Sequence, residues 1–469
     1  MATSLASQLF RLRGIDRTIS TERAQRIRAS FLFDGRQAAD IDNQTILDIG
    51  REGLRELRQI NRRFDRFAAT LFSEAAKDMD RVLQTREEND KLDEAIRGFL
   101  FLAAPHFLTK PAGKALEWLV RRFRIHEFNA KDILAAILPY HETKAFLTML
   151  TIITFESGDM DLFGFLITQR KARRLLDRGT LLAQCVRDRS LMAFIANAVF
   201  RACRMGLDYP GLHSFYATVM SQFITSLPEV DNAAVQFVLP YVLDGLNLSG
   251  RDAQIGAYMA LGALGTRVAL TADALEKALC AVTQQPADVR AMAMCLVQLA
   301  QTQEAPTVAA ALSPRLLGAA ASHAALPQAL CDLAGNYDIG ALLNPLLGAL
   351  ARDALADGDA RVLLASLIPV LPLAHAPVLC ERLVHEYVAL GLARDVRAEA
   401  LEALDMVQLR FGQQLEDAIG AAAAEAGASA DKQQVEAVHR LLYQLKMRGA
   451  STDASKVLPL RDTATTLFL

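Results

Sequence analysis

The chain has 469 residues, of which 52% are hydrophobic and only 7% aromatic, and its formal net charge is −2. This length accommodates several compact units or one long array, and the modest Gly and Pro content excludes a chain that is disordered throughout. Residues 1–204 carry 34 Lys and Arg against 26 Asp and Glu, whereas residues 205–469 carry 17 against 27, so a basic half precedes an acidic half. Such a division favours partners that dock differently on each half, although two ordinary solvated surfaces would give the same composition.

The first residues do not predict a cleaved targeting segment. The opening sequence MATSLASQLFRLRG has no apolar core and becomes charged at Arg11, which argues against a secretory signal. Asp16 and Glu22 argue against a transit peptide. Farther along, apolar residues recur three and four positions apart, as at Leu54 and Leu57, and strand-like alternation is scarce. Nearly the whole chain is therefore predicted to be helical.

The segment Lys114–Thr143 contains Trp118, the only Trp of the chain. Its neighbours Leu116, Leu119 and Val120 form an apolar stripe, so we expect the indole to anchor a core rather than to stack on a base. In the run Leu-Pro-Tyr-His-Glu-Thr that ends the segment, Pro139 is expected to end one helix. Glu142 or Thr143 is expected to start the next, so the run forms a corner between helices.

Two basic clusters are candidate docking sites for RNA or for acidic protein surfaces. The first follows Trp118 and the second precedes Gly179; their members are Arg121, Arg122 and Arg124, and Arg170, Lys171, Arg173 and Arg174. Basic side chains on helices can follow a phosphate backbone, and they can equally form an ordinary solvated face.

The second half repeats a short turn headed by Asp, followed by a helix rich in Leu and Ala. Asp252 and Asp288 are 36 residues apart, Asp288 and Asp359 are 71 apart, and Asp359 and Asp395 are again 36 apart. The missing middle member falls where His323 takes the Asp position. This period is typical of HEAT and armadillo helix pairs, in which the Asp would cap the second helix of each pair.

The predicted fold is therefore all-α, a HEAT/armadillo-like helix-pair solenoid with an irregular N-terminal capping region. We expect a basic helical region over residues 1–205, acidic HEAT-like repeats over 206–450, and a frayed tail over 451–469. The uncharged stretch Val362–Cys380 contains Pro369, Pro372 and Pro377, so it is expected to form two buried half-helices around a turn rather than a membrane span.

Signatures of catalysis and metal binding are missing from the sequence. His-Glu pairs occur at His126, His141 and His385, but the fourth residue after each His is Ala, so no zincin motif forms. Neither a phosphate loop, nor a dinucleotide turn, nor a nucleophile elbow is present. The isolated His residues are expected to be structural, and the six Cys to be buried thiols of a reducing compartment. We expect no catalytic residue, cofactor, metal or small-molecule substrate.

Several short pieces occur in an order that resembles one eukaryotic family. They are MATSLASQLFRLRG, Leu32–Asp34, Ile46–Leu54, Leu71–Ser73, KPAGKALEWL from Lys110, the segment Lys114–Thr143, and Gly179–Leu182. Together they resemble the N-terminal region of the U3 small nucleolar RNA-associated protein ten family, also called HEAT-repeat-containing protein one. The resemblance covers about residues 1–200 and is expected to fade into generic repeat pattern beyond. Members are several times longer, so the chain is expected to be an N-terminal portion, a fragment or a truncated gene product.

The resemblance implies a non-enzymatic scaffold of the nucleolar small-subunit processome, within its UtpA (t-UTP) subcomplex. Implied partners are the β-propeller subunits of that subcomplex, the U3 snoRNP and the 5′ external transcribed spacer of pre-rRNA. Implied roles are 18S rRNA maturation and rDNA transcription, and no membrane is involved. Two alternatives belong to other classes: a cytoplasmic HEAT/armadillo adaptor or transport receptor, and a helical hydrolase. The hydrolase would need convergent carboxylates or a metal on one concave face.

Overall fold

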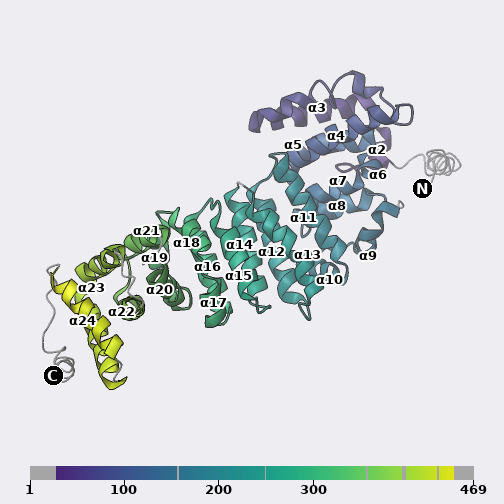
Figure 1. Cartoon of the computed structure of the whole chain (residues 1–469). Helices are drawn as coiled ribbons and strands as arrows, with labels where there is room; N and C mark the ends of the chain where they lie inside the picture. The colour runs from purple at the N-terminus through teal and green to yellow at the C-terminus, as the bar shows by residue number, and fades with distance from the viewer. Residues whose placement is uncertain are drawn as a thin grey trace, which may run out of the picture. The chain divides into compact units, whose positions relative to one another are not determined.

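Every regular element in the described part of the chain is a helix (Figure 1). The computed structural model describes residues 28–155, 158–248, 250–354, 358–392, 398–429 and 432–447. The chain divides into two compact units, the first ending at Ser226 and the second beginning at Leu227. Helices packed in series confirm the all-α, HEAT-like solenoid. Residues 205 and 206, where the sequence predicts the change from basic to acidic surface, lie between α11 and α12 of the first unit. The predicted frayed tail lies outside the described residues.

The first unit combines α-helices of 4 to 18 residues with 3₁₀ segments, as expected for an irregular capping region. Its α-helices are α2 (Gly35–Asp40), α3 (Asn43–Ile60), α4 (Arg86–Ala103), α5 (Lys110–Phe123), α6 (Ile125–Phe128), α7 (Ala130–Ile137), α8 (Lys144–Ile152), α9 (Gly164–Ala172), α10 (Arg178–Arg187), α11 (Arg189–Arg204) and α12 (Pro210–Ser226). Its 3₁₀ turns are η2 (Arg62–Phe67), η3 (Ala75–Lys77), η4 (Ala104–His106), η5 (Leu138–Tyr140) and η6 (Gly158–Phe163).

Helices α3 and α5 pack closely because two glycines of α3 face α5. A Cβ on Gly50 would lie 2.5 Å from the Cβ of Trp118, and a Cβ on Gly53 would lie 2.5 Å from the carbonyl oxygen of Pro111. Trp118 is only 1% exposed, and its indole N–H donates to the carbonyl oxygen of Leu71 at 2.8 Å. The prediction that Trp118 anchors a core is therefore confirmed.

The predicted corner between helices is also present. Helix α7 ends at Ile137, and the single turn η5 follows with Pro139 in its first turn. The Thr143 hydroxyl then accepts from the backbone N–H of Phe146 at 3.2 Å and caps the start of α8. The cap satisfies one of the free N–H groups at the start of every helix, so a new helix can begin after the corner at little cost.

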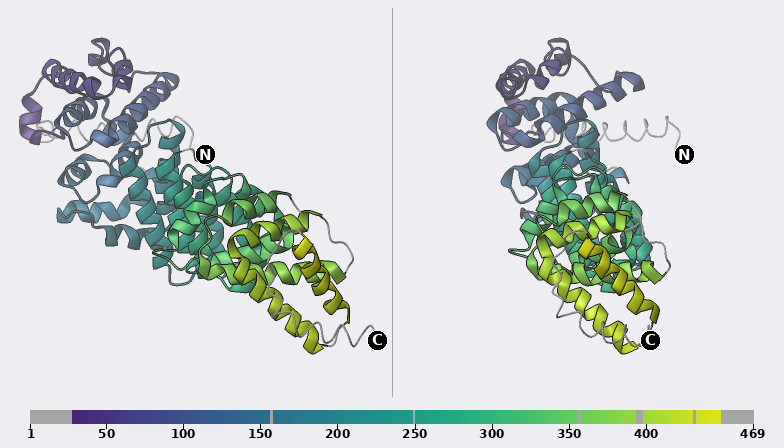
Figure 2. Two further views of the ribbon diagram at one scale, coloured as in Figure 1. Left: turned by 90° about the vertical axis from the view of Figure 1, so that its left-hand side faces the viewer. Right: turned by 60° about the vertical axis from the view of Figure 1, so that its left-hand side comes forward.

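The second unit stacks helices in two layers. Its elements are α13 (Asn232–Leu246), α14 (Arg251–Gly265), α15 (Ala272–Thr283), α16 (Val289–Thr302), α17 (Ala305–Ala311), α18 (Pro314–Ala321), α19 (Leu326–Leu333), α20 (Gly340–Ala354), α21 (Gly358–Leu367), η7 (Leu373–His375), α22 (Ala376–Leu392), α23 (Ala398–Ser429) and α24 (Lys432–Met447). In one layer α14, α16, α19, α21 and α23 pack in succession, and in the other α20 packs on α22 and α22 on α24. Figure 2 shows the last of these helices in yellow-green and yellow. Each helix pair thus buries its apolar face against the next.

The repeated Asp caps a helix at one of the predicted positions. The Asp288 carboxylate accepts from the backbone N–H groups of Arg290 and Ala291, at 2.9 and 3.0 Å, at the start of α16. Its other oxygen lies 2.7 Å from the guanidinium of Arg251 in the preceding pair. The same side chain therefore caps its own helix and links it to α14.

At two other positions the predicted cap is wrong. Asp252 and Asp359 lie inside the first turns of α14 and α21, because each helix begins before its Asp. There a carboxylate still interacts favourably with the helix dipole, but neither Asp is the residue that precedes its helix. Asp395 lies outside the described residues. The ring Nε2 of His323 lies 2.6 Å from the carbonyl oxygen of Thr283 and so also links neighbouring pairs.

Replacing Asp288 with Ala is expected to lower the free energy of unfolding by about 1–2 kcal/mol at neutral pH, because the cap is lost. The backbone N–H of Ala291, more than Arg251, holds the pKa of Asp288 below its ordinary value. The stabilisation is therefore fully present above the pKa of an unfolded Asp and is lost as the pH falls through the lower pKa of the folded state. Urea denaturation followed by circular dichroism at several pH values measures it. Asp252→Ala is the matched control; a loss as large as that of Asp288→Ala would contradict the assignment.

Two glutamines link successive helix pairs through the loops. Gln254 is 3% exposed; its amide nitrogen donates to the carbonyl oxygen of Gln285 at 2.9 Å, and its oxygen accepts from the N–H of Ala287 at 2.7 Å. Gln303, at the end of α16, accepts from the N–H of Leu270 at 2.7 Å. Both side chains satisfy loop backbone groups that have no helical partner.

The stretch Val362–Cys380 forms the two half-helices that its prolines predict. Helix α21 ends at Leu367 and α22 begins at Ala376, with Pro369 and Pro372 between them. Among the described residues, no helix has both the length and the apolar character needed to cross a membrane. All six Cys are free: Cys185, Cys280, Cys295 and Cys380 are buried, and Cys203 and Cys331 are partly exposed.

Candidate docking surface

The first basic cluster contacts the interior of its own unit. Only 5% of the Arg121 side chain is exposed, and one of its nitrogens donates to the carbonyl oxygen of Ile41 at 3.2 Å. A second nitrogen lies 3.8 Å from the Glu117 carboxylate on the same face of α5. Burial lowers the pKa of Arg121, and Glu117 opposes that shift. Arg121 therefore has little surface to offer a partner.

Arg122 and Arg124 are also engaged within the unit. The guanidinium of Arg122 donates to the carbonyl oxygen of Ala76 at 3.0 Å. Arg124 has a positive φ of 50°, ends α5, and pairs with Glu127 in the next turn, with its Nε 2.9 Å from the carboxylate. A partner that bound these side chains would have to break their contacts within the unit.

Glu117 joins two of the sequence pieces that carry the family resemblance. Its side chain has no exposed surface. The carboxylate accepts from the hydroxyl of Ser30 at 2.8 Å and from the backbone N–H groups of Phe31 and Leu32 at 2.6 and 3.0 Å. The piece Leu32–Asp34 is thus held against the helix of KPAGKALEWL, and Asp34 caps α2 directly afterwards. These pieces are motifs of internal packing.

The second cluster lies at the exposed end of α9. Lys171, Arg173 and Arg174 are exposed, and none of them pairs with a carboxylate of the described residues. Arg173 has a positive φ of 50° and ends the helix, where cations are favoured by the helix dipole. Arg170 differs, because it donates to the carbonyl oxygen of Ile153 at 2.9 Å. The exposed residues alone are available for docking.

One further cation adjoins this cluster and was not singled out in the sequence. Arg178 begins α10, is exposed, and lies 4.0 Å from Glu142. We name Lys171, Arg173, Arg174 and Arg178 the α9–α10 basic segment. Leu175, within it, is 43% exposed, so an apolar contact accompanies the charges. A segment of this composition suits phosphate oxygens or an acidic protein surface.

A polar cavity of about 440 Å³ lies elsewhere in the first unit, lined by residues of α4, α7 and α11. Asp132 in its wall lies 2.9 Å from Arg97 and 3.7 Å from Arg201. Asp132 raises the pKa of Arg97, so this guanidinium stays charged. A carboxylate held by two guanidinium groups forms an ion-pair network and not a proton-transfer pair. No sequence pattern indicates this network, because its members lie far apart along the chain.

Comparison with known proteins connects this architecture to a family. Residues 234–350 match the family model described as U3 small nucleolar RNA-associated protein 10. HEAT repeat-containing protein 1 of Homo sapiens is 32% identical over 359 residues, which cover 74% of this chain and 16% of that protein. U3 small nucleolar RNA-associated protein 10 of Pyricularia oryzae is 34% identical over 380 residues, which cover 77% of this chain and 21% of that protein. The chain belongs to this family.

The family likeness extends farther than the sequence pieces indicate. The expectation that it fades beyond about residue 200 is wrong, because the family model matches within the second unit, over residues 234–350. The HEAT-like repeats there carry family-specific sequence. HEAT repeat-containing protein 1 of Danio rerio is 30% identical over 370 residues, covering 76% of this chain and 17% of that protein. The chain thus spans only 16–21% of the length of these relatives.

Proposed function

We propose that the chain is a non-enzymatic scaffold in ribosome biogenesis, located in the nucleolus and associated with U3-containing particles. The observation that carries the proposal is the match of 74–77% of the chain to proteins named for U3 small nucleolar RNA or for HEAT repeats. Stacked helix pairs support it, because such arrays present long surfaces to several partners. We propose that the chain acts by binding several partners at once and so holding them together.

Within that role we propose a place in the UtpA (t-UTP) subcomplex of the small-subunit processome. The proposed partners are β-propeller subunits, the U3 snoRNP and the 5′ external transcribed spacer. The subcomplex would act in 18S rRNA maturation and rDNA transcription. This finer assignment rests on the family resemblance of the N-terminal pieces, whose packing around Glu117 and Trp118 keeps the capping unit intact.

The α9–α10 basic segment is the proposed docking surface within the scaffold. Its residues are exposed, whereas Arg121, Arg122, Arg124 and Arg170 each contact a carbonyl or carboxylate of their own unit. We place protein contact ahead of RNA contact, because exposed Leu175 interrupts the charges. Clusters that meet acidic protein surfaces chiefly speed association.

Affinity purification of the full tagged chain tests the proposal. We expect nucleolar localisation and recovery of processome proteins and U3 RNA. Changing Lys171, Arg173 and Arg174 together to Glu is expected to lower recovery at least tenfold, because three cations become anions at the contact. The matched control replaces three exposed acidic residues of the second unit with Lys, namely Glu229, Glu381 and Glu425. Both variants are first compared with the unmodified chain by circular dichroism and melting.

Three outcomes would count against the proposal. Uniform cytosolic distribution without processome proteins would favour the adaptor or transport-receptor alternative. Equal losses in the basic and acidic variants would show that the α9–α10 basic segment is a solvated face. Loss of recovery after RNase treatment, together with a steep decline of binding with salt, would assign the surface to RNA phosphates instead of protein.

A further inference from the structure

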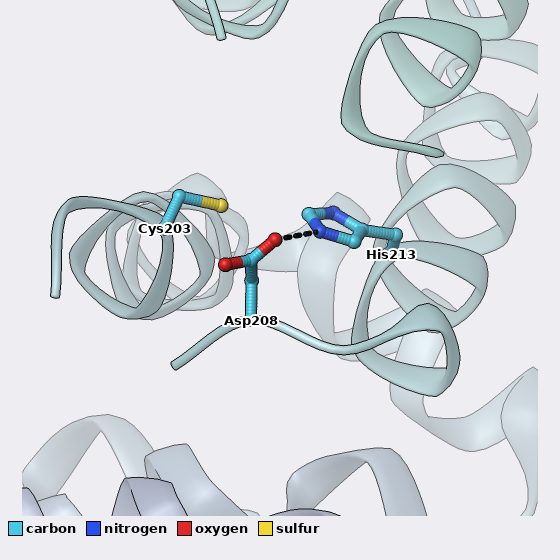
Figure 3. A group of neighbouring side chains, drawn as sticks. All are labelled: Cys203, Asp208 and His213. Carbon is cyan, nitrogen blue, oxygen red and sulfur yellow. Dashed lines mark hydrogen bonds and ion pairs between the residues drawn. The ribbon is translucent and has the colours of Figure 1, made fainter. Parts of the chain in front are cut away.

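Three side chains with metal-binding atoms converge where α11 ends and α12 begins (Figure 3). The Sγ of Cys203, a carboxylate oxygen of Asp208 and a ring nitrogen of His213 all lie within 4.8 Å of one another. The closest pair is the Nε2 of His213 and the Oδ2 of Asp208, 3.0 Å apart. Figure 3 shows the carboxylate between the thiol and the imidazole.

The turn between the helices holds the three residues in place. Gly206 adopts a left-handed φ of 60°, which costs a glycine little. Its N–H donates to the carbonyl oxygen of Cys203, and the N–H of Leu207 donates to that of Ala202, each at 2.9 Å. These bonds end α11 and turn the chain back toward the cysteine. Arg63, from η2, donates to the Gly206 carbonyl oxygen at 2.5 Å and so fastens the turn to a distant part of the first unit.

The donor set has the chemistry that Zn²⁺ prefers. Thiolate sulfur, imidazole nitrogen and carboxylate oxygen are its usual protein ligands, and a mixed set with sulfur discriminates against Mg²⁺ and Ca²⁺. A thiolate and a carboxylate together balance the charge of the ion. His213 is buried, with 4% of its surface exposed, whereas Asp208 is exposed. Solvent can therefore reach the three side chains from the side of the Asp208 carboxylate.

We propose that Cys203, Asp208 and His213 form a Zn²⁺ site with three protein ligands and a fourth position open to water. On binding, the thiol releases its proton to solvent, and the imidazole binds as the neutral ring through the nitrogen that now faces Asp208. Burial, followed by the nearby charge of Asp208, raises the pKa of the Cys203 thiol to about 12.

The sequence expectation of no metal site did not weigh this combination. That expectation rested on the absence of a second His in the His-Glu motifs and on the interpretation of the six Cys as buried thiols. Here the spacing is Cys-x₄-Asp-x₄-His, and the ligands meet only because the Gly206 turn lies between them. Residue spacing alone does not predict a turn that brings these side chains together.

Metal titration of the full chain tests the site directly. After removal of bound metal with a chelator, Zn²⁺ is titrated in competition with a chromophoric chelator, and Co²⁺ is titrated while its absorption is recorded. We expect one ion per chain and, with Co²⁺, the charge-transfer band of a thiolate ligand. Cys203→Ser is expected to abolish that band and to weaken Zn²⁺ binding more than tenfold, since loss of a direct ligand exceeds the usual effect of a supporting residue.

Two further variants keep the test decisive if Cys203→Ser or a change at buried His213 disturbs folding. Asp208→Asn alters an exposed side chain and is expected to weaken Zn²⁺ binding more than tenfold while circular dichroism is unchanged. Cys331→Ser is the matched control, because Cys331 is also partly exposed, also lies beside an Asp, and has a thiol pKa raised to about 11. Absence of stoichiometric binding, a Co²⁺ spectrum without a thiolate band, or equal weakening by Cys331→Ser would overturn the proposal.

Discussion

Replacing Glu117 with Ala is expected to lower the free energy of unfolding of the first unit by about 3–5 kcal/mol, the usual cost of removing one partner from a buried charged pair. The side chain has no exposed surface, and its carboxylate accepts from Ser30, Phe31 and Leu32. Without it, the buried Ser30 hydroxyl and the partly buried N–H groups of residues 31 and 32 lose their acceptor, and the buried Arg121 guanidinium loses its nearby counter-charge. The substitution therefore removes several bonds and leaves a buried charge uncompensated.

The measurement uses the single Trp of the chain. Trp118 adjoins Glu117 on α5, so its selectively excited fluorescence reports unfolding of the first unit during urea denaturation. Glu56→Ala is the matched control: Glu56 pairs with Lys114 at 2.9 Å, but its side chain is 40% exposed, so its loss should cost less than about 1 kcal/mol. If the two variants unfolded alike, the carboxylate of Glu117 would not be what holds residues 30–32 against α5.

Trp118→Ala is expected to cost about 3–5 kcal/mol, because the indole fills the space between α3 and α5. It is 1% exposed, contacts Gly50 closely and donates to the carbonyl oxygen of Leu71. Truncation leaves both a cavity and an unsatisfied carbonyl. Circular dichroism follows unfolding, since the variant has no Trp.

Trp118→Phe separates the contribution of apolar packing from that of the indole hydrogen bond. It retains most of the apolar contact but not the N–H, so a smaller loss of about 1–3 kcal/mol is expected from the unpaired Leu71 carbonyl. Unchanged stability of Trp118→Ala together with loss of a binding partner would mean that Trp118 serves recognition and not packing.

Local patterns in the sequence predicted the features that depend on local chemistry. Trp118 has apolar neighbours at helical spacing, and Pro139 cannot continue a helix, so the core anchor and the corner follow from residues nearby. Local patterns could not predict which Arg side chains are buried and which are exposed. Arg121 and Arg122 donate to Ile41 and Ala76, carbonyl groups 80 and 46 residues away in the chain. Which side of a helix is covered depends on those distant contacts.

The repeat of the second half predicts where helix pairs lie but not where each helix begins. The period of 36 residues predicted the helix pairs, because each pair needs the same apolar spacing to bury its face on the next. The first residue of each helix varies within that period, so Asp288 caps its helix while Asp252 lies inside one. Helix ends are set by individual hydrogen bonds, which a spacing does not specify.

The glutamine side chains between helix pairs have a mechanical consequence. Gln254 and Gln303 each fasten a helix to the loop of a neighbouring pair, so flexing the array requires these loops to move with the helices. Bending is therefore resisted at both of these joints. Replacing either glutamine with a shorter residue would remove its link and make the array more flexible at that helix pair.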